Sequence, residues 1–148
     1  MVSQKCQYAI RATFELAKRH GMGPVKISDI AEAQAIPLRF LEVILNQLRQ
    51  GGFVQSRRGV EGGYYLIRRA EDLTIGEIIR FIEGPTVPVA CLSDKGEAKC
   101  RLHDNCVFIP MWKRVAQAES DIYNQTSFQD LLNDAIALNE TSSLSYSI

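Results

Sequence analysis

The sequence IPLRFLEVILNQLRQGG, residues 36–52, together with FVQSRRGVEGGYYL, residues 53–66, decides the fold of this chain. In the first segment Pro37 suits the opening turn of a helix, because its missing N–H would have no partner there. The glycine pair at 51–52 suits the end of that helix. Apolar residues fall on one face of it, at Leu41, Ile44, Leu45 and Leu48. We therefore expect a helix from Pro37 to about Gln50, buried along that face.

A shorter helix is expected just before it, from Asp29 to Gln34, with Ser28 as its N-cap. A tight connection, Ala35 to Pro37, joins the two helices. Two helices with a short turn between them, the second carrying polar residues outside its apolar stripe, form a helix-turn-helix arrangement. A small helical bundle would give the same pattern, so these two helices alone leave both interpretations open.

The second segment predicts a β-hairpin, with residues 53–55 and 64–67 as strands. The connection between them needs positive φ at one of its glycines, Gly59, Gly62 or Gly63. A hairpin directly after a helix-turn-helix is the wing of a winged helix. Arg57 and Arg58 at its tip suit the minor groove or phosphates, although arginines on a turn can also be merely solvated.

Four further helices are expected, the last of them an amphipathic helix over Ser127–Leu138. The first spans Tyr8–Arg19, and the second spans Thr74–Glu83, where Thr74 and Glu77 form a capping box. The third is long and begins near Phe108. Its apolar residues repeat at intervals of three and four and predict a dimer seam, with packing against its own domain as the alternative. The residues of this seam are Phe108, Met111, Trp112, Val115, Ala118 and Ile122.

Composition limits the class of protein. The chain has 148 residues, 46% of them hydrophobic, which suffices for one small domain with a helical extension. It has neither a signal-peptide pattern nor an apolar run near the roughly 18 residues of a membrane span, so we expect a cytoplasmic protein with no membrane partner. Residues 1–70 hold 11 Lys or Arg and 5 Asp or Glu, although the net charge of the chain is zero. This asymmetry favours contact of the first half with a polyanion, although a solvated mixed surface could also give it.

Three of the four cysteines lie in CLSDKGEAKCRLHDNC, residues 91–106. The segment is polar and turn-prone, so it offers no apolar face on which thiols would pack. In a reducing compartment, metal binding or redox chemistry is a better interpretation than a structural disulfide. The thiolates of Cys91, Cys100 and Cys106 suit an iron-sulfur cluster or zinc, for which His103 is a nearby fourth ligand; their spacing does not choose between the two.

Several motifs in order resemble the IscR, NsrR and RirA group of iron-sulfur winged-helix regulators. They are YAIRATFELA (8–17), the two segments quoted first, LTIGEIIRFIEG (73–84), the three cysteines, and a Trp six residues after the last of them. The resemblance covers residues 5 to about 138. It implies a homodimeric bacterial transcription regulator, usually a repressor, whose cluster responds to iron supply, cluster demand, oxidants or nitric oxide. Neither the cluster type, 2Fe-2S or 4Fe-4S, nor the operator sequence follows from it.

The resemblance also implies a ligand set, from which this chain departs at the fourth position. Where relatives have a His three residues after the last Cys, this chain has Ile109, and where others have a carboxylate near the N-terminus it has Gln7. The adjacent Cys6 is our candidate for the fourth ligand, supplied across a dimer interface. The alternative is that Cys6 only packs in the core, and His103 and Asp104 are lesser candidates.

For DNA, we expect Arg39 and Glu42 to read base edges and Phe40 to lie near a thymine methyl. The wing would contribute Arg57, Arg58 and Gly59, and Ser28 and Gln34 would touch phosphates.

The expected fold is mainly α with a small β wing (α+β), divided into a winged helix-turn-helix domain (1–84), a cysteine loop (85–107), a dimerisation helix with a C-terminal helix (108–138) and a flexible tail (139–148). One alternative function is a winged-helix regulator, with zinc or no metal, that senses thiols or a small effector. Another is a dimeric scaffold that does not bind DNA. An enzyme or electron carrier is disfavoured, because the sequence has no Ser/His/Asp set and no phosphate-binding glycine loop after a strand.

Overall fold

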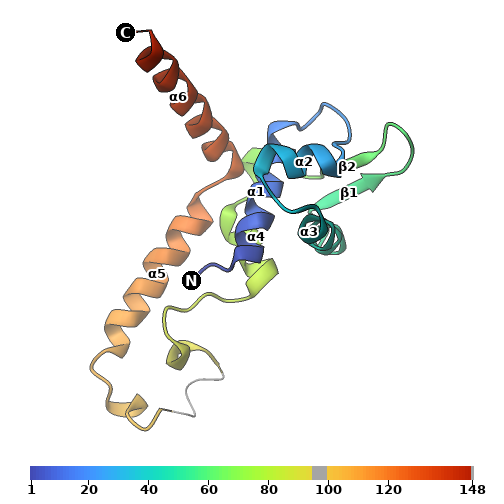
Figure 1. The fold of residues 1–148 in the computed structure, drawn as a ribbon. Helices are drawn as coiled ribbons and strands as arrows, with labels where there is room; N and C mark the ends of the chain where they lie inside the picture. The colour runs from blue at the N-terminus through green and yellow to red at the C-terminus, as the bar shows by residue number, and fades with distance from the viewer. Residues whose placement is uncertain (95–99, 148) are drawn as a thin grey trace.

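The computed structural model describes residues 1–94 and 100–147. It is mainly helical with one antiparallel pair of strands, which confirms the expected fold class (Figure 1). The elements in order are α1 (Gln4–Lys18), α2 (Ile27–Gln34), α3 (Leu38–Gln50), β1 (Val54–Arg57), β2 (Gly63–Leu66), η1 (Ala70–Asp72), α4 (Ile75–Glu83), η2 (Ala90–Leu92), η4 (His103–Asn105), α5 (Ile109–Gln125) and α6 (Phe128–Tyr146).

Helix α1 lies at the centre of the winged domain and packs against α2, α3 and α4. It begins at Gln4, four residues earlier than expected, because Ser3 caps it by accepting from the Cys6 backbone N–H. Its most buried face carries small side chains, which allow neighbouring helices to approach closely. This face includes Cys6, Ala9, Ala12 and Leu16. Ile10 and Phe14 of the same helix are only partly buried.

The helix-turn-helix is present, with two changes at its ends. Helix α2 begins at Ile27 with Lys26 as the N-cap residue, so Ser28 lies exposed in the first turn and the expected Ser28 cap is wrong. The cause is a β-bridge, in which Val25 exchanges backbone hydrogen bonds of 2.7 and 2.8 Å with Tyr64. The bridge holds the chain extended up to Lys26, and the helix starts directly after it. Pro37 is the N-cap of α3 and not its first residue.

The wing is a regular hairpin in which Val54 pairs with Leu66 and Arg57 with Gly63. Its connection uses the conformational freedom of Gly59, whose φ is +110°. A Cβ on Gly63 would lie 2.3 Å from the Val25 carbonyl oxygen, so only glycine allows the bridge to form there. The hairpin is therefore tied to the segment that leads into α2.

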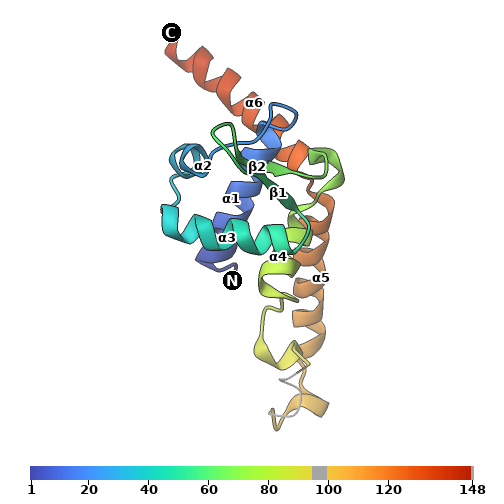
Figure 2. The ribbon, with the colours of Figure 1, turned by 90° about the vertical axis from the view of Figure 1, so that its right-hand side faces the viewer.

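The junction between α5 and α6 docks on the winged domain. Phe128 is fully buried, and its N–H donates to the Leu73 carbonyl at 3.0 Å. Ile75 N–H donates to the Thr126 carbonyl at 3.0 Å, and Thr74 forms a β-bridge with Ser127. The expected capping box of Thr74 is confirmed here, and a second one opens α6. From this junction α5 and α6 run outward in different directions (Figure 2).

Helix α6 continues to Tyr146, so the expected flexible tail is wrong for residues 139–146; Ile148 lies outside the described residues. Serine and threonine side chains there hydrogen-bond to carbonyl groups four residues earlier, as Thr141 does to Ala137 at 3.0 Å. This bonding satisfies the hydroxyls within the helix and is compatible with helix continuation. Within the described residues no helix is long and apolar enough to cross a membrane.

Candidate nucleic-acid interface and cysteine loop

Helix α3 presents two distinct faces. Its apolar face is buried in the core at the four positions expected from the sequence, Leu41, Ile44, Leu45 and Leu48. The opposite face is exposed and carries Arg39, Phe40 and Glu42. The structure therefore places all three predicted base-reading residues on one accessible surface.

An array of rings and guanidinium groups crosses from α1 to the start of α3. The Arg39 guanidinium lies 5.2 Å from the centre of the Phe40 ring, and the Phe40 ring lies 6.4 Å from that of Tyr8. Arg11 lies over the other aromatic ring of the pair, 5.4 Å from the centre of Tyr8. Cation–π contacts at exposed sites contribute about 0.5–1 kcal/mol, so they favour this orientation of Arg39 at the N-terminal end of α3.

Sequence reasoning missed two apolar residues on this surface. Val43 is 61% exposed and lies next to Glu42, and Leu38 at the start of α3 is also exposed. Val43 falls outside the buried stripe of α3, and a helical projection of the sequence would have shown this. Leu38 follows the spacing of the stripe but is exposed because it is the first residue of the helix. Exposed apolar side chains on a recognition helix suit contact with thymine methyl groups.

The wing presents Arg57, Arg58 and Gly59, all exposed. Arg57 lies 6.0 Å from the centre of the Tyr65 ring on the paired strand, and Tyr65 donates its hydroxyl proton to Gln55 at 2.5 Å. The base of the wing is thereby ordered while its tip remains accessible. The tip also exposes Val60, which the sequence analysis did not single out.

The cysteine loop lies at the end of α5 that points away from the winged domain (Figure 1). Cys91 is half-buried in η2, Cys100 is exposed, and Cys106 is half-buried just after η4. All are free thiols. Within residues 1–94 and 100–147, no three Cys, His, Asp or Glu side chains come together as a metal site, and positions 95–99 of the expected loop lie outside the described residues. The three thiols are thus near one another in sequence but are not preassembled.

Cys6 does not join this group. It is 0% exposed and belongs to the hydrophobic core, where burial, with a smaller contribution from the Glu83 carboxylate, raises the pKa of its thiol to about 11. The structure thus places Cys6 in the core of its own chain, as the packing alternative expects. Its assignment as the fourth ligand across a dimer interface stays a prediction.

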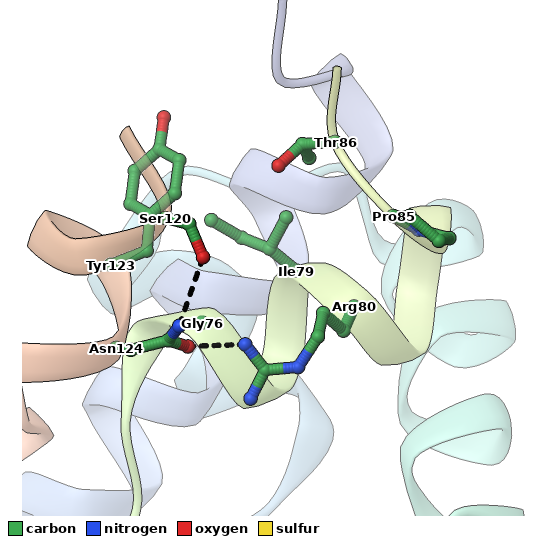
Figure 3. A pocket seen from close by; sticks show the side chains of 8 residues that line it. All are labelled: Gly76, Ile79, Arg80, Pro85, Thr86, Ser120, Tyr123 and Asn124. Carbon is green, nitrogen blue, oxygen red and sulfur yellow. Dashed lines mark hydrogen bonds between the residues drawn. The ribbon is translucent and has the colours of Figure 1, made fainter. Parts of the chain in front are cut away.

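A joint between α4 and α5 links the winged domain to the long helix that carries the expected dimer seam (Figure 3). Asn124 accepts a hydrogen bond from Arg80 and donates one to the Ser120 hydroxyl at 3.0 Å. A Cβ on Gly76 would lie 2.2 Å from Asn124 Oδ1, so this glycine permits the close approach of the helices. A cavity of about 150 Å³ remains beside the joint, bordered on the far side by Thr86.

Helix α4 also touches the C-terminal end of α3. The Phe81 ring lies against Gly51, the residue that ends α3, and 5.0 Å from the centre of the Phe53 ring. Helix α4 therefore contacts both the recognition helix α3 and helix α5, and it leads through Gly84 into the cysteine loop.

The expected dimer seam lies on the surface of this chain. In the part of α5 that the structure describes, Ile109–Gln125, no residue is buried. Ile122 is 64% exposed, and most of the other seam residues are exposed as well: Phe108, Met111, Val115 and Ala118, with Trp112 half-buried. Helix α5 contacts α4 near its C-terminal end, but its apolar stripe is left without packing partners among the described residues of its own chain.

These elements define a winged-helix DNA-binding protein with a cysteine-bearing loop. The family model Rrf2, described as an iron-dependent transcriptional regulator, matches residues 2–134, and the chain belongs to this family. It is therefore a transcription regulator and not an enzyme.

Three relatives illustrate the range of the family. The regulator CymR of Bacillus subtilis is 36% identical over 130 residues, 88% of each chain; its structure, titled the global cysteine regulator, superposes with a TM-score of 0.72. The regulator IscR of Pectobacterium atrosepticum is 30% identical over 138 residues, 93% of this chain and 82% of that protein. The structure of T. potens IscR has a TM-score of 0.75 at 34% identity and covers 91% of this chain and 88% of that one.

Proposed function

We propose that this chain is a cytoplasmic, homodimeric regulator whose binding to a double-stranded operator is controlled by an iron-sulfur cluster on Cys91, Cys100 and Cys106. The observation that carries the proposal is the gathering of three free thiols in one polar segment between α4 and α5. The resemblance to iron-sulfur regulators and the iron-dependent description of the family support it.

The donor set suits iron chemically, because soft thiolates are the usual ligands of iron-sulfur clusters. Metal binding is commonly coupled to the ordering of the loop that provides the ligands, so separated thiols in the described residues are compatible with a site that forms on binding. When bound, a cluster would supply a centre sensitive to oxidants and to iron supply. Cys6 lies in the core of its own chain, so its use as fourth ligand would require that part of α1 to open, and His103 in the same loop is a second candidate.

Within the protein, helix α4 would transmit the state of the cysteine loop to the DNA-binding surface. Its last residues lead into the loop, Phe81 packs on the end of α3, and Arg80 binds Asn124 of α5. A change of order in the loop would therefore reach both the recognition helix and the dimer helix through one rigid element. Two recognition helices must match half-sites about 34–36 Å apart or a multiple of that distance, so a small change in this arrangement alters the affinity for the operator.

Dimerisation through α5 is supported by its exposed apolar residues, Met111, Val115 and Ile122 among them. In a symmetric dimer the same stripe of both chains would meet along the helix.

A second candidate is a regulator that senses thiols or oxidants directly through these cysteines. Two observations favour it: Cys100 is exposed and therefore accessible to oxidants, and one of the relatives is a cysteine regulator. In this case the loop would act through covalent chemistry of its thiols, with no metal.

One experiment separates the two. The protein is purified under strictly anaerobic conditions, its absorbance is recorded, and iron and sulfide are counted per chain, alongside a variant with serine at positions 91, 100 and 106. The cluster proposal predicts coloured wild-type protein with iron and sulfide in similar amounts, and colourless variant. Colourless wild-type protein with background iron, whose DNA binding changes on treatment with a thiol oxidant, would establish direct thiol sensing instead.

A further inference from the structure

Glu15 of α1 is a buried charge whose role the DNA surface and the cysteine loop do not explain. It is 2% exposed, and both of its carboxylate oxygens are engaged. Oε1 accepts from Arg19 Nε at 2.7 Å, and Oε2 accepts from Gln34 Nε2 at 2.8 Å. A carboxylate is rarely buried unless such bonds replace its water, so the position of Glu15 calls for a reason.

Its partner Gln34 is the last residue of α2, directly before the turn into the recognition helix. One turn earlier on α1, Arg11 donates from its guanidinium to the carbonyl oxygen of Gln34 and, at 3.5 Å, to that of Ala35. The last carbonyl groups of a helix lack partners within it and form the negative end of its dipole. Helix α1 thus contacts Gln34, the end of α2, in two ways: the Glu15 carboxylate binds its side chain, and the Arg11 guanidinium binds its backbone carbonyl.

The turn that follows is conformationally demanding. Ala35 has φ 49° and ψ 50°, the left-handed region that residues with a side chain seldom occupy. Such a residue persists where the surrounding structure determines its conformation. Beyond it, the Ile36 N–H donates to the Ala31 carbonyl at 2.9 Å, the Ile36 side chain is buried, and α3 starts at Leu38. The conformation at Ala35 therefore sets the direction in which α3 leaves the turn.

We propose that Glu15, acting with Arg11, is a positioning residue for DNA recognition: it fixes the end of α2 and the turn, and so the orientation of α3 on the duplex. Gln34, a candidate for phosphate contact from sequence, instead turns inward to Glu15. Arg19 does not take part in this positioning. It donates to Oε1 of Glu15 and, among the described contacts, its side chain forms no hydrogen bond to α2 or to the turn.

The test uses a duplex enriched from a random library by the wild-type protein, and four variants of the full chain. Gln34→Ala and Glu15→Ala remove the hydrogen bond between α1 and the last residue of α2. The double exchange Glu15→Gln with Gln34→Glu restores a hydrogen bond between the two positions with the groups reversed. Arg19→Ala is the matched control, because it removes the ion pair of Glu15 and leaves its bond to Gln34.

Gln34→Ala and Glu15→Ala should bind the enriched duplex about tenfold more weakly at fixed salt, the loss typical of one misplaced base contact. Their affinity for unrelated duplex, which depends on phosphate contacts, should stay within about twofold. The exchange variant should regain most of the specific affinity, and Arg19→Ala should keep it even if its resistance to urea falls. Gln34 is half-buried, so Gln34→Ala should fold. If Glu15→Ala does not fold, the comparison of Gln34→Ala with the exchange variant still tests the proposal.

Equal affinity of wild type, Gln34→Ala and the exchange variant for the enriched duplex would overturn the proposal. So would an equal loss in Arg19→Ala, because the effect would then follow stability alone. If wild type enriched no duplex, DNA recognition itself would fail, and backbone hydrogen exchange over residues 35–41 would decide the matter. The proposal predicts faster exchange at Ile36 in Gln34→Ala and recovery in the exchange variant; unchanged exchange would refute it.

Discussion

Replacing Gly51 with alanine should destabilise the winged domain by about 1–3 kcal/mol, the usual cost of overpacking, here at a half-buried contact on the edge of the core. The backbone is not the cause, because φ −78° and ψ −3° suit any residue. The cause is the Phe81 ring: an alanine Cβ would lie 2.4, 2.6 and 2.9 Å from three of its carbon atoms. Carbon atoms pack best at about 3.5–4.0 Å, so the ring would have to move by about 1 Å. It cannot do so freely, since it packs on Phe53.

The assay is urea unfolding followed by circular dichroism, at one protein concentration because self-association would add to apparent stability. A double-mutant cycle with Phe81→Leu isolates the contact. With the smaller side chain at position 81, Gly51→Ala should cost less than about 0.5 kcal/mol, the range of substitutions without a special contact. An equal cost of Gly51→Ala in both backgrounds would show that the ring is not responsible, and the packing of α4 on the end of α3 would need another explanation.

Three further predictions address the thiols, the capping box and the wing. In metal-free folded protein at about pH 8, iodoacetamide should modify Cys100 and leave Cys6 intact until urea unfolds the chain. The reason is that burial raises the pKa of the Cys6 thiol to about 11. Modification of Cys6 before unfolding, detected by mass spectrometry, would contradict its burial. Burial raises the pKa of Glu77, but hydrogen bonds from Arg68 and Thr74 outweigh it and hold the pKa below its ordinary 4.5. Ionised Glu77 therefore stabilises the fold above that value, and the stability lost in Glu77→Gln should shrink as pH falls from about 6 to about 3; a constant difference would argue against the linkage. Arg58→Ala should weaken operator binding by about 1–3 kcal/mol, and unchanged affinity at fixed salt would remove the wing from the interface.

The sequence was informative where local chemistry decides the structure. The stripe of Leu41, Ile44, Leu45 and Leu48 predicted both the helix and its buried face, and the glycines after Arg58 predicted the hairpin. The Thr74 capping box also formed as expected. In each of these cases the deciding interactions lie within a few residues of one another in the chain.

Features that depend on distant residues were not predictable. The start of α2 depends on the bridge between Val25 and Tyr64, which are far apart in the chain. The local sequence predicts Ser28 as the N-cap of α2, whereas the bridge moves the start of the helix to Ile27. The buried position of Cys6 depends on how α1 packs among other helices, and no local pattern distinguishes a packed thiol from a ligand. The inward turn of Gln34 likewise depends on Glu15, 19 residues earlier.

The central claim is that iron bound by the cysteine loop controls DNA binding. It is tested most directly by measuring iron, acid-labile sulfide and affinity for the enriched duplex in one anaerobic sample, before and after the cluster is removed by a chelator. The account predicts iron and sulfide in similar amounts at the start, and a change in affinity that accompanies their loss and is absent when Cys91, Cys100 and Cys106 are all serine. Unchanged affinity after complete iron loss, or background iron from the outset, would contradict it.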